Sequence, residues 1–243
     1  YGAENPQLHG VLGLSDVDYR EFYAVNVLAR GISVIVAHPD TPWRSLKELM
    51  EDVKNRPGEI KMGSTGPGGL PYVVGAMLGT QGEFNIIPVP FDGDGPAITA
   101  LLGGHVDFLP SGYTATSEHI RAGRLRALAV VNDEEIELLP GIPPLTQDYP
   151  AFKKFLPWGP FYGVFIDKDA PDSVKTKLTE AFHQGATDPA FEKFVTDFGA
   201  IQMNVSGEEA NVFLEKWQSV TTWLLHDAGA TKTSPEVFGI ERP

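Results

Sequence analysis

The chain contains no cysteine. Within this sequence, disulfides, thiolate metal sites, thiol nucleophiles and cysteine-ligated iron–sulfur clusters are therefore excluded. Positive charge is also scarce, because 19 Lys and Arg stand against 32 Asp and Glu and the formal net charge is −13. Affinity for nucleic-acid backbones comes mainly from clustered Lys and Arg. The composition thus argues against a nucleic-acid-binding protein.

Long apolar runs are missing as well. The longest, around residues 32–37, is far shorter than the roughly 18–20 residues of a membrane-spanning helix. The chain opens at Tyr1 without an initiator Met, a basic segment or an apolar signal core, so we expect any signal peptide to be removed or to lie outside this sequence. The 243 residues, 42% hydrophobic and 21% charged, have a globular composition that suits one large domain or two small ones.

A pattern of strand, turn and helix recurs through the first two thirds of the chain. Short apolar runs predict strands at 32–37, 59–64, 84–91, 106–111, 126–131 and 162–167. Helices are predicted between them, the first capped by Thr41 and running from Pro42 to a stop at Pro57, the others at 71–78, 96–102 and 116–122. Strands that alternate with helices in this way favour βαβ units and a mainly parallel sheet in an α/β protein.

The last third has a different character, with long helices predicted at 171–186, 188–198 and 206–226. Apolar residues recur in them at helical spacing and predict a buried face: Leu178, Phe182, Phe191, Phe194, Phe198, Phe213, Trp217, Val220 and Leu224. The proline-rich segment 132–160 predicts a long ordered connection. The simplest arrangement is one α/β lobe, a crossover, and a helical segment that completes a second lobe.

The Gly-rich segment 63–71 lies where a strand should lead into a helix. It lacks the Lys-Ser/Thr of a phosphate-binding P-loop, and Pro71 occupies the third small position of the dinucleotide-binding pattern. Met62 occupies the first glycine position of a nucleophile elbow around Ser64. Backbone N–H groups and the hydroxyls of Ser64 and Thr65 at a helix start instead favour an anion. A turn that uses its glycines only for backbone geometry explains the same residues.

Two further turns, at 91–97 and 111–114, have the same layout, and ligands of open α/β sheets collect at the carboxyl ends of strands. No Lys or Arg occurs from Met62 to Ile120. An anion bound here must be held by N–H dipoles, hydroxyls and water, which favours reversible binding over phosphoryl transfer. Asp92 and Asp94 are either exposed turn residues or ligands for Ca²⁺ or for an ammonium group.

The six histidines show no metal-ligand spacing, and no Ser/His/Asp arrangement is evident from spacing. These patterns predict no metal and no cofactor, and they favour a binding protein over an enzyme.

Four segments in order then carry a resemblance. They read Gly-Ser-Thr-Gly-Pro-Gly-Gly at 63–69, Val-Pro-Phe-Asp-Gly-Asp-Gly-Pro-Ala at 89–97, Ala-Leu-Leu-Gly-Gly-His-Val-Asp at 100–107 and His-Ile-Arg-Ala-Gly-Arg-Leu-Arg-Ala-Leu-Ala at 119–129. The series resembles the periplasmic solute receptors of tripartite tricarboxylate transporters, the Bug or TctC family. The resemblance implies a type II periplasmic-binding-protein fold, with two α/β lobes around a ligand cleft. It further implies a periplasmic, non-catalytic monomer without metal or cofactor that binds a small carboxylated solute and delivers it to membrane permease subunits.

The resemblance also implies site residues and lobe limits. The ligand-binding candidates are Ser64, Thr65, Gly68, Gly69, Phe91, Asp92, Gly95, Pro96, Ala97, Ser111 and Tyr113. Residues 37–162 are expected to form the second lobe, and 1–36 with 163–243 the remainder of the first, whose N-terminal part is expected to be absent. Family members often have Ser or Thr where Gly69 stands, so one hydroxyl contact is expected to be missing.

Two alternatives remain open at this point. One is an α/β hydrolase-like enzyme that uses Ser64, and the other is a ligand-sensing partner of a two-component system. For the ligand itself, Asp92 and Asp94 favour a molecule with an amine or many hydroxyls over a bare tricarboxylate, because like charges nearby lower affinity.

Overall fold

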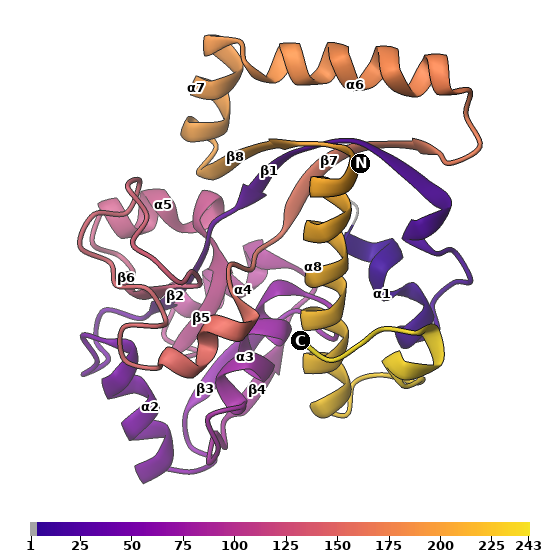
Figure 1. Ribbon diagram of the computed structural model, residues 1–243. Coiled ribbons are helices and arrows are strands. Elements are labelled where there is room, and N and C mark those ends of the chain that lie inside the picture. The colour runs from indigo at the N-terminus through magenta and orange to yellow at the C-terminus, as the bar shows by residue number, and fades with distance from the viewer. Residues whose placement is uncertain (1–3) are drawn as a thin grey trace. The chain divides into compact units, whose positions relative to one another are not determined.

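The computed structural model describes residues 4–243, apart from the side chains of 4–6, and the chain divides into two compact units (Figure 1). Unit 1 combines Tyr1–Gly31 with Pro160–Pro243, and unit 2 is Ile32–Gly159. The boundaries between them lie a few residues before the lobe limits expected at 37 and 162.

Unit 2 is built on a five-stranded sheet with the order β4-β3-β5-β2-β6. Its strands are β2 (Ser33–Ala37), β3 (Lys61–Ser64), β4 (Ile87–Pro90), β5 (Phe108–Gly112) and β6 (Arg126–Val130). Strand β3 is parallel to β4 and β5, whereas β2 is antiparallel to both β5 and β6. The expectation of a mainly parallel sheet therefore misses the reversed β2. Alternation along the chain predicts crossovers, but it does not show which strand is inserted between two others.

The helices of unit 2 are α2 (Leu46–Asn55), α3 (Leu70–Gly79), α4 (Asp94–Leu102) and α5 (Tyr113–Arg121). The prediction that α2 begins at Pro42 is wrong. Ser45 caps the helix by accepting the Glu48 N–H at 3.2 Å, and the Glu48 carboxylate accepts the Arg44 N–H. The Ser45–Glu48 bond is one half of a capping box, and the other half is shifted by one residue, because Glu48 accepts from Arg44 and not from Ser45. The Thr41 hydroxyl instead donates to the His38 carbonyl oxygen at 2.7 Å.

Unit 1 contains a three-stranded antiparallel sheet with the order β7-β1-β8. Its strands are β1 (Phe22–Gly31), β7 (Phe161–Asp167) and β8 (Ala200–Val205), and its helices are α1 (Glu4–Leu12), α6 (Asp172–Ala186), α7 (Pro189–Asp197) and α8 (Gly207–Asp227). Helix α6 runs along one side of this sheet and α8 lies on the other (Figure 1). Because residues in the middle and end of β1 are buried on both faces, β1 shows no period of two, and the sequence did not predict it.

The predicted apolar face of the last third is only partly buried. Trp217, Val220 and Leu224 on α8 are at most 4% exposed, but Phe194 on α7 is 60% exposed. Its ring stacks on Phe198 at the outside of the unit, with ring centroids 5.9 Å apart. Only Val195 of α7 is buried, so this helix covers the sheet with a narrower stripe than the aromatic spacing predicts.

The connection 132–160 contains neither an α-helix nor a strand. Its regular structure is a short 3-10 helix, η2 (Pro150–Phe155), and an isolated bridge between Pro144 and Val130. This agrees with the long ordered connection predicted there. Across residues 4–243, every helix is too short or too polar to cross a membrane.

A carboxylate on α2 makes the stability of the protein depend on pH. Asp52 accepts hydrogen bonds from Arg56 Nε at 2.8 Å and from Trp43 Nε1 at 2.8 Å. The Arg56 hydrogen bonds lower the pKa of Asp52 against the opposing effect of burial, and the Trp43 bond lowers it further. A carboxyl whose pKa is lower in the folded state stabilises the fold above its unfolded pKa of about 3.9, and this contribution is lost as the pH falls through the folded pKa.

We expect Asp52→Asn to lower the free energy of unfolding at pH 7 by about 1.5–3 kcal/mol, the usual range for hydrogen bonds to a charged group. The deficit should shrink as the pH falls below about 4, because the carboxyl of the unfolded chain is protonated first, and it should vanish only below the lowered pKa of the folded state. Urea denaturation at pH 7 and pH 3 measures both quantities. Asp40→Asn, whose side chain is 92% exposed, is the control and should change the free energy by less than about 0.5 kcal/mol. An equal deficit for Asp52→Asn at both pH values would contradict the assignment.

Candidate functional site

Three strands of unit 2 end at one edge of its sheet. Ser64 of β3 pairs with Pro90 of β4 in parallel register, and Met62 pairs with Phe108 of β5. The Phe91 N–H donates to the Ser64 carbonyl oxygen at 2.8 Å, which joins the first two loops directly. From this edge, which we call the loop edge, the chain leads into α3, α4 and α5. The structure brings the loops that carry the predicted ligand residues to this edge, and their contact with a ligand stays a prediction.

Each helix that starts at the loop edge has a glycine as its N-cap. Gly69, Gly93 and Gly112 lack a side chain, and none of the three helix starts has a side-chain capping bond. Of the other helices, α2 and α7 are capped by Ser45 and Asp188, whereas α6 and α8 also lack a side-chain capping bond. The first N–H groups of a helix have no partner within the helix and carry a partial positive charge. Three such starts at one edge form a surface that attracts negative charge.

Prolines and one backbone contact limit the donors at this edge. Pro71 and Pro96 lie in the first turns of α3 and α4, and proline has no N–H. At α5, the Tyr113 N–H already donates to the Ile32 carbonyl oxygen at 2.8 Å. The donors available to an anion therefore belong mainly to α3 and α4.

The first loop is shaped by glycines in the left-handed region. Gly66 has φ of 85° and Gly68 has φ of 86°, and the Gly69 N–H closes a turn onto the Gly66 carbonyl oxygen at 3.1 Å. A Cβ on Gly69 would lie 2.1 Å from Thr65 Oγ1. The Thr65 hydroxyl thus occupies the space that a side chain at position 69 would need. Among the described residues it has no hydrogen-bond partner, so it is available at the start of α3.

The second loop carries the two aspartates. Asp92 and Asp94 are both exposed, and Asp94 is the first residue of α4. Although Asp94 is exposed as a whole residue, partial burial of its carboxyl group raises the pKa of that group above its ordinary value. Ala97 differs from its loop neighbours, because it is fully buried and its N–H donates to the Gly93 carbonyl oxygen at 3.3 Å. It therefore belongs to the packed interior of unit 2. Over residues 4–243, no group of three or more His, Asp or Glu side chains is placed to hold a metal ion.

Two serines at the loop edge have unsatisfied hydroxyls. Ser111 and Ser33 are at most 1% exposed, and neither Oγ has a hydrogen-bond partner. Within the described residues of unit 2, they are the only buried side-chain polar atoms without a partner. Buried polar groups in folded proteins are nearly always hydrogen-bonded, so such exceptions call for an explanation.

Ser33 is the edge residue that sequence reasoning missed. It pairs with Gly112 of β5, and its carbonyl oxygen accepts the Val131 N–H at 2.8 Å. The antiparallel insertion of β2 puts the start of this strand beside the end of β5. In the sequence Ser33 is only a small polar residue at the start of an apolar run, and the reversal that brings it to the edge has no local signal.

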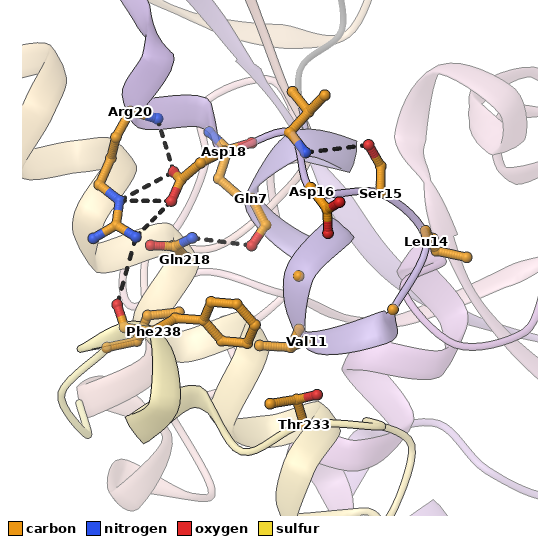
Figure 2. Close-up of a pocket in the computed structure, with 14 residues that line it drawn as sticks. Gln7, Val11, Leu14, Ser15, Asp16, Asp18, Arg20, Gln218, Thr233 and Phe238 are labelled. Atoms are coloured by element: carbon orange, nitrogen blue, oxygen red, sulfur yellow. Dashed lines mark hydrogen bonds and ion pairs between the residues drawn. The ribbon is translucent and has the colours of Figure 1, made fainter.

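A cavity of about 520 Å³ lies within unit 1 and contains none of the predicted ligand residues (Figure 2). Val11 and Ile240 are among its lining residues, and Gln218 Nε2 donates to the Gln7 carbonyl oxygen at 3.0 Å. Arg20 Nε donates to the Asp18 carboxylate at 2.9 Å. Burial would raise the pKa of Asp18, but the hydrogen bonds and charge of Arg20 outweigh it and hold that pKa below its ordinary value. Among the described residues that line the cavity, Arg20 is the only cation, and it is engaged by Asp18.

The comparisons with known proteins agree on one family. The model of the tripartite tricarboxylate transporter family receptor, TctC, matches residues 10–225. A Pseudomonas sp. (strain P51) protein from the tcbD-tcbE intergenic region is 27% identical over 204 residues, which are 83% of this chain and 59% of that protein. The chain thus spans little more than half the length of this relative.

Solved structures share the fold. The periplasmic binding protein BugD superposes with a TM-score of 0.77 and 25% identity over 95% of this chain and 77% of that one. MatC from Rhodopseudomonas palustris, solved with bound malate, has a TM-score of 0.70 and 22% identity over 90% of this chain and 75% of that one. These likenesses confirm the predicted periplasmic-binding-protein fold. The family match over most of the chain identifies it as a member of the TctC receptor family of tripartite tricarboxylate transporters, a family of solute-binding receptors and not of enzymes.

Proposed function

We propose that this protein is a periplasmic solute receptor that binds a small carboxylate at the loop edge of unit 2 and delivers it to the membrane permease subunits of a tripartite tricarboxylate-type transporter. One observation carries the proposal: three helices without side-chain caps start at one sheet edge, in a stretch without Lys or Arg from Met62 to Ile120.

The chemistry of this edge suits a carboxylate. Helix N–H groups and the hydroxyls of Ser64 and Thr65 can donate to carboxylate oxygens, as anion sites at helix starts do. Because Met62 to Ile120 contain no Lys or Arg, these loops themselves compensate negative charge only through dipoles, and this favours binding that is readily reversed. The malate bound to MatC is a dicarboxylate, which supports the same class of solute here.

The hydrolase alternative has little support. A serine nucleophile needs a base within hydrogen-bond reach, and in the described structure Ser64 is only 3% exposed and forms no hydrogen bond with a histidine. The family consists of receptors as well. A role as ligand-sensing partner of a two-component system uses the same binding edge, so co-purification with permease subunits or with a sensor kinase decides between the two roles.

We expect small di- and tricarboxylates to raise the midpoint of thermal unfolding, because a ligand that binds only the folded state stabilises it by RT ln(1 + [L]/Kd). At a concentration of one hundred Kd the gain is about 2.7 kcal/mol. Thr65→Ala should reduce this gain by about 1 kcal/mol, the usual value of one hydrogen bond.

The matched control for this experiment is Thr99→Ala. The Thr99 hydroxyl donates to the Gly95 carbonyl oxygen within α4, so its loss leaves the helix starts in place and should leave the ligand-induced gain unchanged. Unfolding midpoints that do not respond to any carboxylate in the panel would refute the proposed function.

A further inference from the structure

A second cavity of unit 1, about 250 Å³ in volume, gathers positive charge in an acidic protein. Its described lining residues include three cations, Arg20, Lys168 and Lys175, and a single carboxylate, Glu215. Arg20 is engaged by Asp18, but the two lysines leave the lining with a positive balance. Because the cavity is smaller than the roughly 300–1,000 Å³ of sites for drug-sized molecules, it suits a small anion.

The two lysines are available to such an anion. None of the described ion pairs includes Lys168. Lys175 Nζ lies 3.6 Å from Asp172 Oδ1, but the Asp172 side chain is fully exposed, and exposed ion pairs contribute little. The Lys175 side chain is only 20% exposed, and its ammonium group lies 5.5 Å from the ring centroid of Tyr23. Packing against this ring therefore keeps the charge of Lys175 at the cavity.

A buried tyrosine at the cavity has an unused hydroxyl. Tyr19 is 8% exposed, and its hydroxyl makes no hydrogen bond with a described group. Buried tyrosine hydroxyls usually have a partner. Tyr19 is not among the described residues whose unpaired polar atoms are fully enclosed, so its hydroxyl reaches the open space that the residue lines. Burial, with a smaller contribution from the charge of Glu215, raises the pKa of Tyr19 to about 12. At pH 7 the hydroxyl is therefore a hydrogen-bond donor.

One face of α8 completes the lining with donors and one acceptor. Gly207 is the first residue of α8, and the N-cap Ser206 makes no side-chain capping bond. Asn211 and Glu215 follow at intervals of four residues, and all three line the cavity, as residues on one helix face do. Glu215 takes part in no described ion pair and can only accept hydrogen bonds at pH 7. The cavity thus offers several donors and a single carboxylate acceptor.

An anion that still carries a proton matches both kinds of group. We infer that this cavity binds hydrogen phosphate. Its oxygens accept from the Tyr19 hydroxyl and from the ammonium groups of Lys168 and Lys175, and its own hydroxyl donates to the Glu215 carboxylate. A fully ionised oxyanion such as sulfate has no proton to donate, so the Glu215 carboxylate repels it. The site lies in unit 1 and goes beyond the proposed function, which concerns the loop edge of unit 2.

The test is isothermal titration calorimetry of the whole chain at pH 7 with inorganic phosphate, sulfate and dimethyl phosphate. All three are small oxyanions, but at this pH only inorganic phosphate carries a proton. We expect phosphate to bind about tenfold more tightly than either of the others, as one charge-assisted hydrogen bond provides. Dimethyl phosphate also represents the diester headgroup of a lipid, so its weaker binding distinguishes free phosphate from a membrane surface.

Three variants test the assigned groups. Tyr19→Phe should weaken phosphate binding about tenfold and leave the midpoint of thermal unfolding unchanged, because no described protein group uses the hydroxyl. Lys168→Gln should also weaken binding about tenfold. Glu215→Gln should remove the preference for phosphate over sulfate, because an amide can donate to an oxyanion that has no proton. The control is Lys193→Gln, whose exposed ammonium group pairs with Asp197 on α7, and it should bind phosphate normally.

The outcomes separate this site from the proposed function. The inference is overturned if phosphate does not bind, if sulfate binds as tightly as phosphate, or if Tyr19→Phe retains the wild-type affinity. It is also overturned if succinate displaces phosphate, because the two anions would then share the loop edge. A Glu215→Gln variant that still prefers phosphate contradicts the role of Glu215. A protein that binds phosphate but responds to no carboxylate would refute the proposed function and leave this inference standing.

Discussion

Phe161→Ala is expected to lower the free energy of unfolding by about 3–5 kcal/mol, the usual cost of truncating a fully buried Phe. Phe161 begins β7, is 0% exposed, and packs edge-on against Phe213 and Trp217 at centroid distances of 5.5 Å and 5.3 Å. Truncation removes apolar contacts between the sheet and α8 and leaves a cavity that the surrounding helix and strand fill only in part. Urea denaturation followed by circular dichroism measures the loss.

The next residue of the strand provides the control. Tyr162 points to the other face of the sheet and is 38% exposed. Its ring packs edge-on against Phe198, with ring centroids 5.5 Å apart. Tyr162→Ala should therefore cost about 1 kcal/mol, close to an average substitution. If the two alanine variants lose the same free energy, Phe161 does not have the central packing role assigned to it.

Gly68→Val is expected to weaken carboxylate binding at least about tenfold, which corresponds to about 1.4 kcal/mol. Gly68 has φ of 86°, and a β-branched residue in this region is a strained outlier. The loop must move its backbone to relieve this strain, which costs about 1–3 kcal/mol. Because Gly68 precedes the N-cap of α3, the movement shifts the N–H groups that face the anion.

Two controls separate a misplaced loop from a poorly folded protein. Gly185→Val lies within α6 of unit 1, where an added Cβ has nothing within 4 Å, and should bind the carboxylate normally. Circular dichroism of Gly68→Val should retain the wild-type spectrum, because the loop contributes little regular structure. Wild-type affinity in Gly68→Val would show that the geometry of this loop does not matter for binding.

The parts of the site that could be predicted from sequence are those that depend on local chemistry. The Gly-rich segment 63–71 indicates a turn between a strand and a helix, and the absence of Lys and Arg from Met62 to Ile120 indicates recognition through dipoles. Strand–turn–helix spacing also predicts that the three loops follow strand ends. Each inference needs only residues close together in the chain, and the structure agrees on the turns and on the common edge.

The errors arise where segments compete or where distant segments meet. Two helix starts compete before α2, and Ser45 prevails because its hydroxyl accepts the Glu48 N–H, whereas the Thr41 hydroxyl donates to the His38 carbonyl oxygen. Aromatic spacing predicts burial of Phe194, but α7 presents only Val195 to the interior. Spacing shows that residues share a helical face and does not show how wide a stripe the neighbouring sheet can cover.

The sequence by itself determined the character of this protein: an acidic, cysteine-free α/β chain with Gly-rich turns at helix starts and a run of residues without a cation. Only the tertiary structure decided which residues share the loop edge. Insertion of β2 between β5 and β6 places Ser33 beside Gly112, although these residues lie far apart in the chain. The physical reason is that strand order depends on backbone hydrogen bonds between distant segments. All residues except proline offer those bonds equally, so composition and periodicity carry no record of the pairing.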